Sequence, residues 1–310
     1  MQYVYKLIPL VFPVAAVATP MIFELNIHPV GYFVLNYNVV GRSGGPFTAP
    51  LIHMLAEDLG PVSVRDGEYL NITTVDNEHV ITQSLLQPVP GTGEAIIPIG
   101  FQSVFATDFA MTYMMIPSNR QLIINPRDPR EFVYGGILTT TRSTSENYPQ
   151  VQVSVSLLLN TTRALTGDFI PSETIESTAI HEFVIASVEE HDNVPESIIR
   201  ALYDELERRG IPCDPGYGLD GSLRGIDIFG DLTDEVLETF PILQYRIHGD
   251  AGHDVIIQLD GRDYVGPSND DLRELTLRSG DMNAFGLSTL SRIALFIDNR
   301  DRTIGFGEPL

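Results

Sequence analysis

The carboxyl-terminal stretch of residues 292–306, Arg-Ile-Ala-Leu-Phe-Ile-Asp-Asn-Arg-Asp-Arg-Thr-Ile-Gly-Phe, contains two predicted strands. Residues 292–297 form a mostly apolar run, and residues 302–306 combine β-branched and aromatic side chains. The Asp-Asn-Arg-Asp segment between them is polar and typical of a turn. We therefore expect the chain to end in two short strands.

The same pattern recurs upstream, where short apolar runs are bounded by Gly, Pro, Asn or Asp. Further strands are expected at residues 22–27, 32–40, 68–75, 79–86, 95–99, 109–115, 121–124, 151–159, 179–187, 243–247, 254–259 and 274–277. A helix is expected at residues 195–209, with Asn193 as its N-cap candidate and Gly210 as its stop, and a shorter one at residues 47–58. Because helices do not alternate with the strands, the sequence predicts an all-β protein with a few short helices.

Composition excludes several classes of protein. The 310 residues allow two modest domains or one large one, and 43% hydrophobic residues indicate a globular chain. Lys+Arg number 19 against 41 Asp+Glu, and a net charge of -22 disfavours nucleic acids and anionic lipid surfaces as partners. The single Cys213 leaves no internal disulfide and no multi-cysteine zinc site. No apolar run reaches the length of a membrane-spanning helix, so we expect no membrane span.

The amino terminus resembles a signal peptide. One positive charge at Lys6 precedes an apolar run, and Ala16-Val17-Ala18 supplies the small-x-small pattern of a cleavage site. Residues 1–18 are therefore the expected leader, with a buried amino-terminal strand as the alternative. Export predicts a secreted protein, or one in the endomembrane or vacuolar lumen, and would expose the glycosylation sequons at Asn71 and Asn160.

Two local motifs are interpreted as ordinary loops. Residues 216–221 match G-x-G-x-x-G, but no strand is expected before them and no helix after them, which disfavours a dinucleotide site. His248 and His253 flank a Gly-Asp-Ala-Gly turn beside Asp254, and a solvated hairpin tip is favoured there over a metal site.

A third motif offers a nucleophile. Gly41-Arg42-Ser43-Gly44-Gly45 is a G-x-S-x-G sequence after an apolar strand, and a helix is expected to follow it. Those are the surroundings of a nucleophile elbow, with Ser43 exposed on a tight turn. Only one strand pair precedes the motif and no alternating helices follow, so a flexible loop is the favoured interpretation.

The chain's closing segment resembles a known family. Phe285-Gly286, Asp298 twelve residues later, and Ile304-Gly305-Phe306 resemble, without a gap, the ending of the pepsin-like aspartic peptidases. Upstream, Phe240-Pro241 is similar to the family's Phe-Pro strand. Residues 94–101 resemble, more faintly, its Asp-Gly-Ile-Leu-Gly-Leu stretch.

The resemblance implies an all-β, bilobal double β-barrel with a few short helices. Residues 19–140 would form the N-terminal lobe and residues 141–310 the C-terminal lobe, joined by a polar link that includes residues 139–145. It further implies a peptide or protein ligand in the interlobe cleft, and neither a cofactor nor a metal.

The catalytic motifs of that family are missing. Its enzymes bring one Asp from each lobe, in Asp-Thr/Ser-Gly loops, to share a proton around one water. The Thr or Ser after each Asp hydrogen-bonds the two loops together. Neither tripeptide occurs in this chain; the alignment puts Asn36 and Glu182 at the acid positions, and Tyr69 is the flap candidate.

Three functions remain open from the sequence, besides an unrelated β protein. The first is a secreted pepsin-fold protein that has lost peptidase activity and keeps its cleft for binding. The second is an active aspartic endopeptidase with an atypical acid pair, Glu182 with a nearby Asp such as Asp66. The third is a serine hydrolase that uses Ser43.

The leader makes the first testable prediction. If residues 1–18 are removed on export, amino-terminal sequencing of protein secreted from eukaryotic cells should begin at Thr19. A mature protein that begins at Met1 or Gln2 would contradict the prediction.

Overall fold

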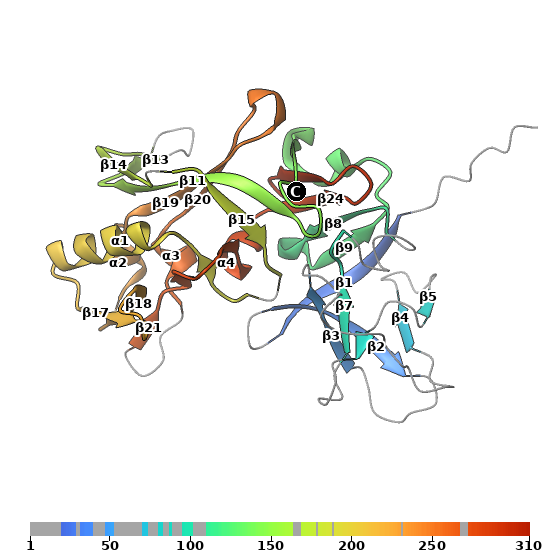
Figure 1. Ribbon diagram of the computed structural model, residues 1–310, viewed down its shortest axis with the longest axis horizontal. Coiled ribbons are helices and arrows are strands. Elements are labelled where there is room, and N and C mark those ends of the chain that lie inside the picture. Colours follow the sequence, from blue (N-terminus) through green and yellow to red (C-terminus); the bar gives the residue numbers. More distant parts are fainter. Residues whose placement is uncertain are drawn as a thin grey trace, which may run out of the picture.

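The computed structural model describes most of the chain from Pro20 onward. The described residues are 20–28, 32–39, 47–52, 70–73, 80–82, 87–88, 95–101, 110–163, 169–177, 179–187, 189–230, 232–266 and 272–310. The expected leader and the candidates Ser43, Asp66 and Tyr69 lie outside these residues. The described part is mostly strand, which confirms the all-β prediction (Figure 1).

The first and largest sheet combines strands from both ends of the chain. It contains β1 (Met21–His28), β2 (Tyr32–Val39), β3 (Phe47–Ile52), β4 (Leu70–Thr73), β5 (Val80–Thr82), β6 (Gln87–Pro88), β7 (Ala95–Pro98), β8 (Thr112–Ile116), β9 (Gln121–Ile124), β10 (Thr139–Arg142), β24 (Ala294–Asp298) and β25 (Thr303–Gly307). From the edge strand β10 inward, the order is β10-β25-β24-β8-β9-β1, with every neighbouring pair antiparallel. The carboxyl-terminal strands, red in Figure 1, thus lie against the green strands of the first half.

The middle of this sheet is apolar on both faces. On β8, Tyr113 and Met115 join the main hydrophobic core, whereas Met114 and Ile116 belong to a second cluster on the other face. Phe296 of β24 is also in that second cluster. Side chains alternate across a strand, so a strand that is covered on both faces needs a continuous apolar run. This explains why β8 and β24 are continuous apolar runs rather than alternations of apolar and polar residues.

The second sheet contains β11 (Gln150–Leu159), β14 (Glu173–Glu176), β15 (His181–Ile185), β16 (Asp192–Asn193), β19 (Ile242–Ile247), β20 (Val255–Leu259), β22 (Leu277–Arg278) and β23 (Asn283–Phe285). Two small sheets accompany it: β12 (Thr162–Arg163) with β13 (Phe169–Ile170), and β17 (Cys213–Tyr217) with β18 (Leu223–Phe229) and β21 (Leu272–Glu274). The long strand β11 lies between β15 and β19, so it is the strand around which this part of the fold is built.

Helices are short and few in the described residues. They are α1 (Glu196–Arg208), α2 (Asp234–Leu237), α3 (Gly261–Tyr264) and α4 (Leu287–Leu290), with the 3-10 turns η3 (Pro117–Asn119), η4 (Pro129–Phe132), η5 (Tyr134–Gly136) and η6 (Asp250–Gly252). The predicted helix at residues 195–209 is confirmed as α1, whose buried face carries Ile199, Leu202 and Leu206. Its N-cap residue is Pro195, whereas the expected cap Asn193 belongs to β16.

Two local predictions are wrong, and one segment of the expected link forms a strand. Residues 47–52 form strand β3 rather than a helix, because they pair with β2 on one side and β7 on the other. Residues 139–142 form the edge strand β10, and the role of residues 139–145 as a link between lobes stays a prediction. The G-x-G-x-x-G stretch begins inside strand β17 and continues into the turn before β18, so it does follow a strand, although no helix opens after it. Tertiary pairing decided each of these segments.

The described residues also bear on the membrane. Among them, no helix has both the length and the apolar character that a transmembrane crossing requires. The division into two lobes stays a prediction.

Candidate functional site

Two parallel strand ends form the centre of the candidate site. β15 and β23 pair in parallel, with Ile185 opposite Phe285, and the amide of Ala186 donates to the Phe285 carbonyl at 3.0 Å. The rings of Phe183, Tyr245 and Phe285 pack together beneath them, with centroids 4.9 to 5.7 Å apart. This aromatic cluster holds the ends of both strands in a fixed position.

Ser187, which follows β15, connects this centre to the first half of the chain. Its hydroxyl donates to the carbonyl of Leu51 in β3, and its own carbonyl accepts from the amide of Phe33 in β2 at 3.1 Å. Ser187 is 2% exposed. These two hydrogen bonds, one donated by the buried hydroxyl and one accepted by the backbone carbonyl, connect the second half of the chain to the first at Ser187. We call this connection the Ser187 tie, and the place where it joins β15 to β2 and β3 the junction.

The first half has a similar local arrangement. β3 pairs in parallel with β7, Leu51 lying opposite Ile97, and the chain then reaches the buried Ile99 and Gly100. The buried Tyr113 hydroxyl donates to the Ile99 carbonyl at 3.1 Å. The two halves therefore share a pattern. β15 pairs in parallel with β23, which is followed by Gly286, and β3 pairs in parallel with β7, which is followed by Gly100.

Asp192 is hydrogen-bonded to the residues next to the β15–β23 pair. Its carboxylate is fully buried and accepts bonds from the Gly286 amide at 2.7 Å, the Thr289 hydroxyl at 2.6 Å and the Tyr245 hydroxyl at 3.1 Å. Burial raises the pKa of Asp192 to about 6, although these three donors act in the opposite direction. Gly286 has no alternative here, because a Cβ would lie 2.3 Å from the carbonyl oxygen of His191.

The two acid positions predicted from the alignment, Asn36 and Glu182, lie on strands β2 and β15. Asn36 is on β2, with its backbone opposite Thr48 of β3, and its side chain is outside the described residues. Glu182 is on β15, where its exposed side chain accepts a bond from the Gln150 amide at 3.2 Å. Their roles stay predictions.

Sequence reasoning missed Ser187 and Asp192. The available signal for Ser187 was a hydroxyl residue directly after the apolar run 183–186, at the end of an expected strand. No local signal distinguishes Asp192 from its acidic neighbours Glu189 and Glu190, because only the fold buries it.

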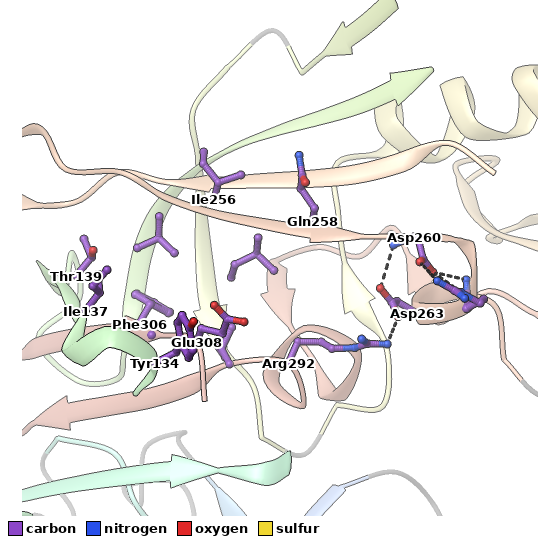
Figure 2. A pocket seen from close by; sticks show the side chains of 15 residues that line it. Tyr134, Ile137, Thr139, Ile256, Gln258, Asp260, Asp263, Arg292, Phe306 and Glu308 are labelled. Carbon is purple, nitrogen blue, oxygen red and sulfur yellow. Dashed lines mark hydrogen bonds and ion pairs between the residues drawn. The ribbon is translucent and has the colours of Figure 1, made fainter. Parts of the chain in front are cut away.

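A groove of about 860 Å³ lies elsewhere, between β20, β25 and the η5 turn (Figure 2). Tyr134, Ile137 and Ile256 line it and are at least 45% exposed. At one end, Arg292 pairs with Asp263 of α3. The groove offers apolar surface and paired charges, but its lining contains no arrangement that points to a reaction.

Comparison with known proteins adds no family: no family model and no curated protein matches this chain.

Asp192 predicts an unusual dependence of stability on pH. Between about pH 4 and 6 the folded protein holds a proton on Asp192 that the unfolded chain has released, so this residue's contribution to stability falls as pH rises through that window. Across the whole window, the contribution of Asp192 to the free energy of unfolding falls by roughly 3 kcal/mol. The Asp192→Asn variant should lose this component, measured by urea unfolding at pH 4, 5, 6 and 7.

The exposed Asp204 on α1 provides the matched control. Asp204→Asn should keep the wild-type dependence of unfolding free energy on pH. Parallel curves for wild type and Asp192→Asn would refute the prediction.

Proposed function

We propose that this chain is a secreted, pepsin-like bilobal protein that binds a peptide or protein segment in the cleft between its halves and lacks acid peptidase turnover. The observation that carries the proposal is the Ser187 tie, which joins β15 to β2 and β3. The residue directly before it, Ala186, has no carboxylate.

The tie agrees with the role that the family resemblance assigns to the Thr or Ser of each catalytic loop. That hydroxyl residue directly follows the acid, so the register of Ser187 favours Ala186 as the acid position. Glu182 is four positions earlier and its exposed carboxylate contacts Gln150. Under this proposal a methyl group occupies the acid position in the second half, and Glu182 has no catalytic role.

The strand topology supports the bilobal part of the proposal. β24 and β25 return from the end of the chain to pair antiparallel with β8 and β10, which places strands from both halves in one sheet. The parallel pairs β15–β23 and β3–β7 then occupy corresponding positions on either side of the Ser187 tie. Such a repeated arrangement agrees with two related lobes.

The chemistry explains why binding would persist without turnover. Two carboxylates that share a proton supply one acid and one base, and each proton transfer typically contributes about a hundred- to ten-thousand-fold. Ala186 offers no ionisable group, so under this alignment the second half supplies no acid. The hydrogen bonds of Ser187 do not depend on those acids, so the loss of turnover leaves the proposed binding surface in place. The net charge of -22 favours a basic or neutral peptide over an acidic one.

The proposal predicts binding without cleavage. Purified protein should leave a denatured protein substrate intact at pH 3 to 5, with or without a pepstatin-type inhibitor. Titration with a library of unstructured basic peptides, followed by fluorescence anisotropy, should show saturable binding that weakens as salt rises.

Ser187 connects that binding to the junction. Ser187→Ala removes the buried donor to the Leu51 carbonyl, which should cost about 1 kcal/mol of stability and lower peptide affinity. Ser118→Ala, at an exposed site in η3, is the control and should bind as wild type does. Proteolysis at pH 3 to 5 that disappears in Glu182→Ala would overturn the proposal in favour of an active enzyme.

A further inference from the structure

A separate pocket of about 410 Å³ opens on the face of the second sheet, over β11 and β19. Ser154, Arg246 and His248 line one side of it, and Ala179 and Ile180 line another. None of these residues takes part in the tie at Ser187. The pocket is therefore a second place at which chemistry can be sought.

The strand register brings three of these side chains to one face. Ser154 of β11 lies directly opposite Arg246 of β19, and His248 follows β19 with its amide bonded to the Gln152 carbonyl at 3.0 Å. Directly opposed residues of an antiparallel pair project to the same face of the sheet. The Ser154 hydroxyl lies 2.9 Å from Nε2 of His248.

The hairpin between β19 and β20 adds a carboxylate. The chain turns back through η6, so that Asp254 faces His248, with 3.6 Å between Oδ1 and Nδ1. The second oxygen of Asp254 lies 3.7 Å from Nη1 of Arg246. A carboxylate beside Nδ1 favours the tautomer with its proton on that nitrogen, which leaves the Nε2 lone pair free to accept from Ser154.

This arrangement has the order of a nucleophile, a base and a group that orients the base. The hydroxyl-to-imidazole distance is already that of a hydrogen bond. The carboxylate lies 3.6 Å from the imidazole, within ion-pair range, so Asp254 stabilises the imidazolium that forms when the ring takes a proton. His248 is 30% exposed, so a substrate can approach it from solvent.

We propose that Ser154 is the nucleophile of an ester-hydrolysing site, with His248 as its general base and Asp254 as a positioning residue. The substrate class is a small carboxylic ester with a short acyl chain, which fits an open pocket with Ile180 as its apolar wall. Ile180 is 58% exposed, so its side chain is accessible to an acyl group in this pocket.

The reaction balances without any further cofactor. The Ser154 oxygen attacks the ester carbonyl while its proton passes to Nε2 of His248, and the resulting tetrahedral oxyanion lies beside the Arg246 guanidinium. Collapse breaks the bond to the alcohol oxygen, which takes the proton from His248 and leaves. A water then attacks the acyl-serine, gives its proton to His248, and releases the carboxylic acid as Ser154 recovers that proton.

The experiment uses the full chain and two probes. A fluorophosphonate should label one serine, which peptide mapping should identify as Ser154, and p-nitrophenyl acetate should be hydrolysed. Both signals should be abolished in Ser154→Ala. His248→Ala should lower the labelling rate about a hundred- to ten-thousand-fold. Asp254→Asn should lower kcat with little change in KM, and Asp254→Glu should restore part of kcat.

His253 is the matched control, because it is exposed on the same hairpin. His253→Ala should label and hydrolyse as wild type does, and circular dichroism with thermal melting should show that every variant is folded. An absence of labelling in folded wild type would overturn the proposal. Labelling of another serine, such as Ser43, would overturn it as well, and neither result would affect the peptide-binding proposal.

Discussion

The pairing of β24 with β8 is the constraint on which the rest of the structure depends. Leu295 lies opposite Met115 and Ile297 opposite Tyr113, so a strand near the end of the chain pairs with a strand from its first half. Burying a large apolar side chain contributes roughly 1.5 to 3 kcal/mol, and these strands bury such side chains on both faces. Without this pairing, β25 and β10 would have no sheet to extend.

The junction at Ser187 depends on that sheet. A single hydroxyl contributes only about 1 kcal/mol, so it does not by itself hold two halves of a protein together. Once the central sheet has positioned them, however, the bond from Ser187 to Leu51 fixes how the ends of β15 and β3 face each other. Beneath this bond, Asp192 satisfies the amide of Gly286 and thereby fixes the start of α4. The hydrophobic core supplies the stability, and the buried polar groups supply the exact geometry.

The two sites that we propose illustrate different uses of the β-sheet. At the junction, the ends of β15 and β3 lie side by side, and peptide binding is the function that we propose for it. On the open face, the regular register of β11 and β19 presents side chains from separate strands to solvent. The first arrangement needs both halves of the chain, whereas the second needs only one sheet and one hairpin. Either site can therefore be lost without loss of the other.

The sequence by itself determined which segments are extended and where the main helix lies. The apolar runs of β8 and β11 and the spacing of Ile199, Leu202 and Leu206 on α1 are local patterns, and each was confirmed within a few residues. Only the tertiary structure decided that residues 47–52 are a strand, that Ser154 meets His248, and that Ser187 reaches Leu51. The physical reason is that backbone donors and acceptors are the same in every strand. A local pattern specifies an extended segment, but the partner is selected by the packing of the whole chain.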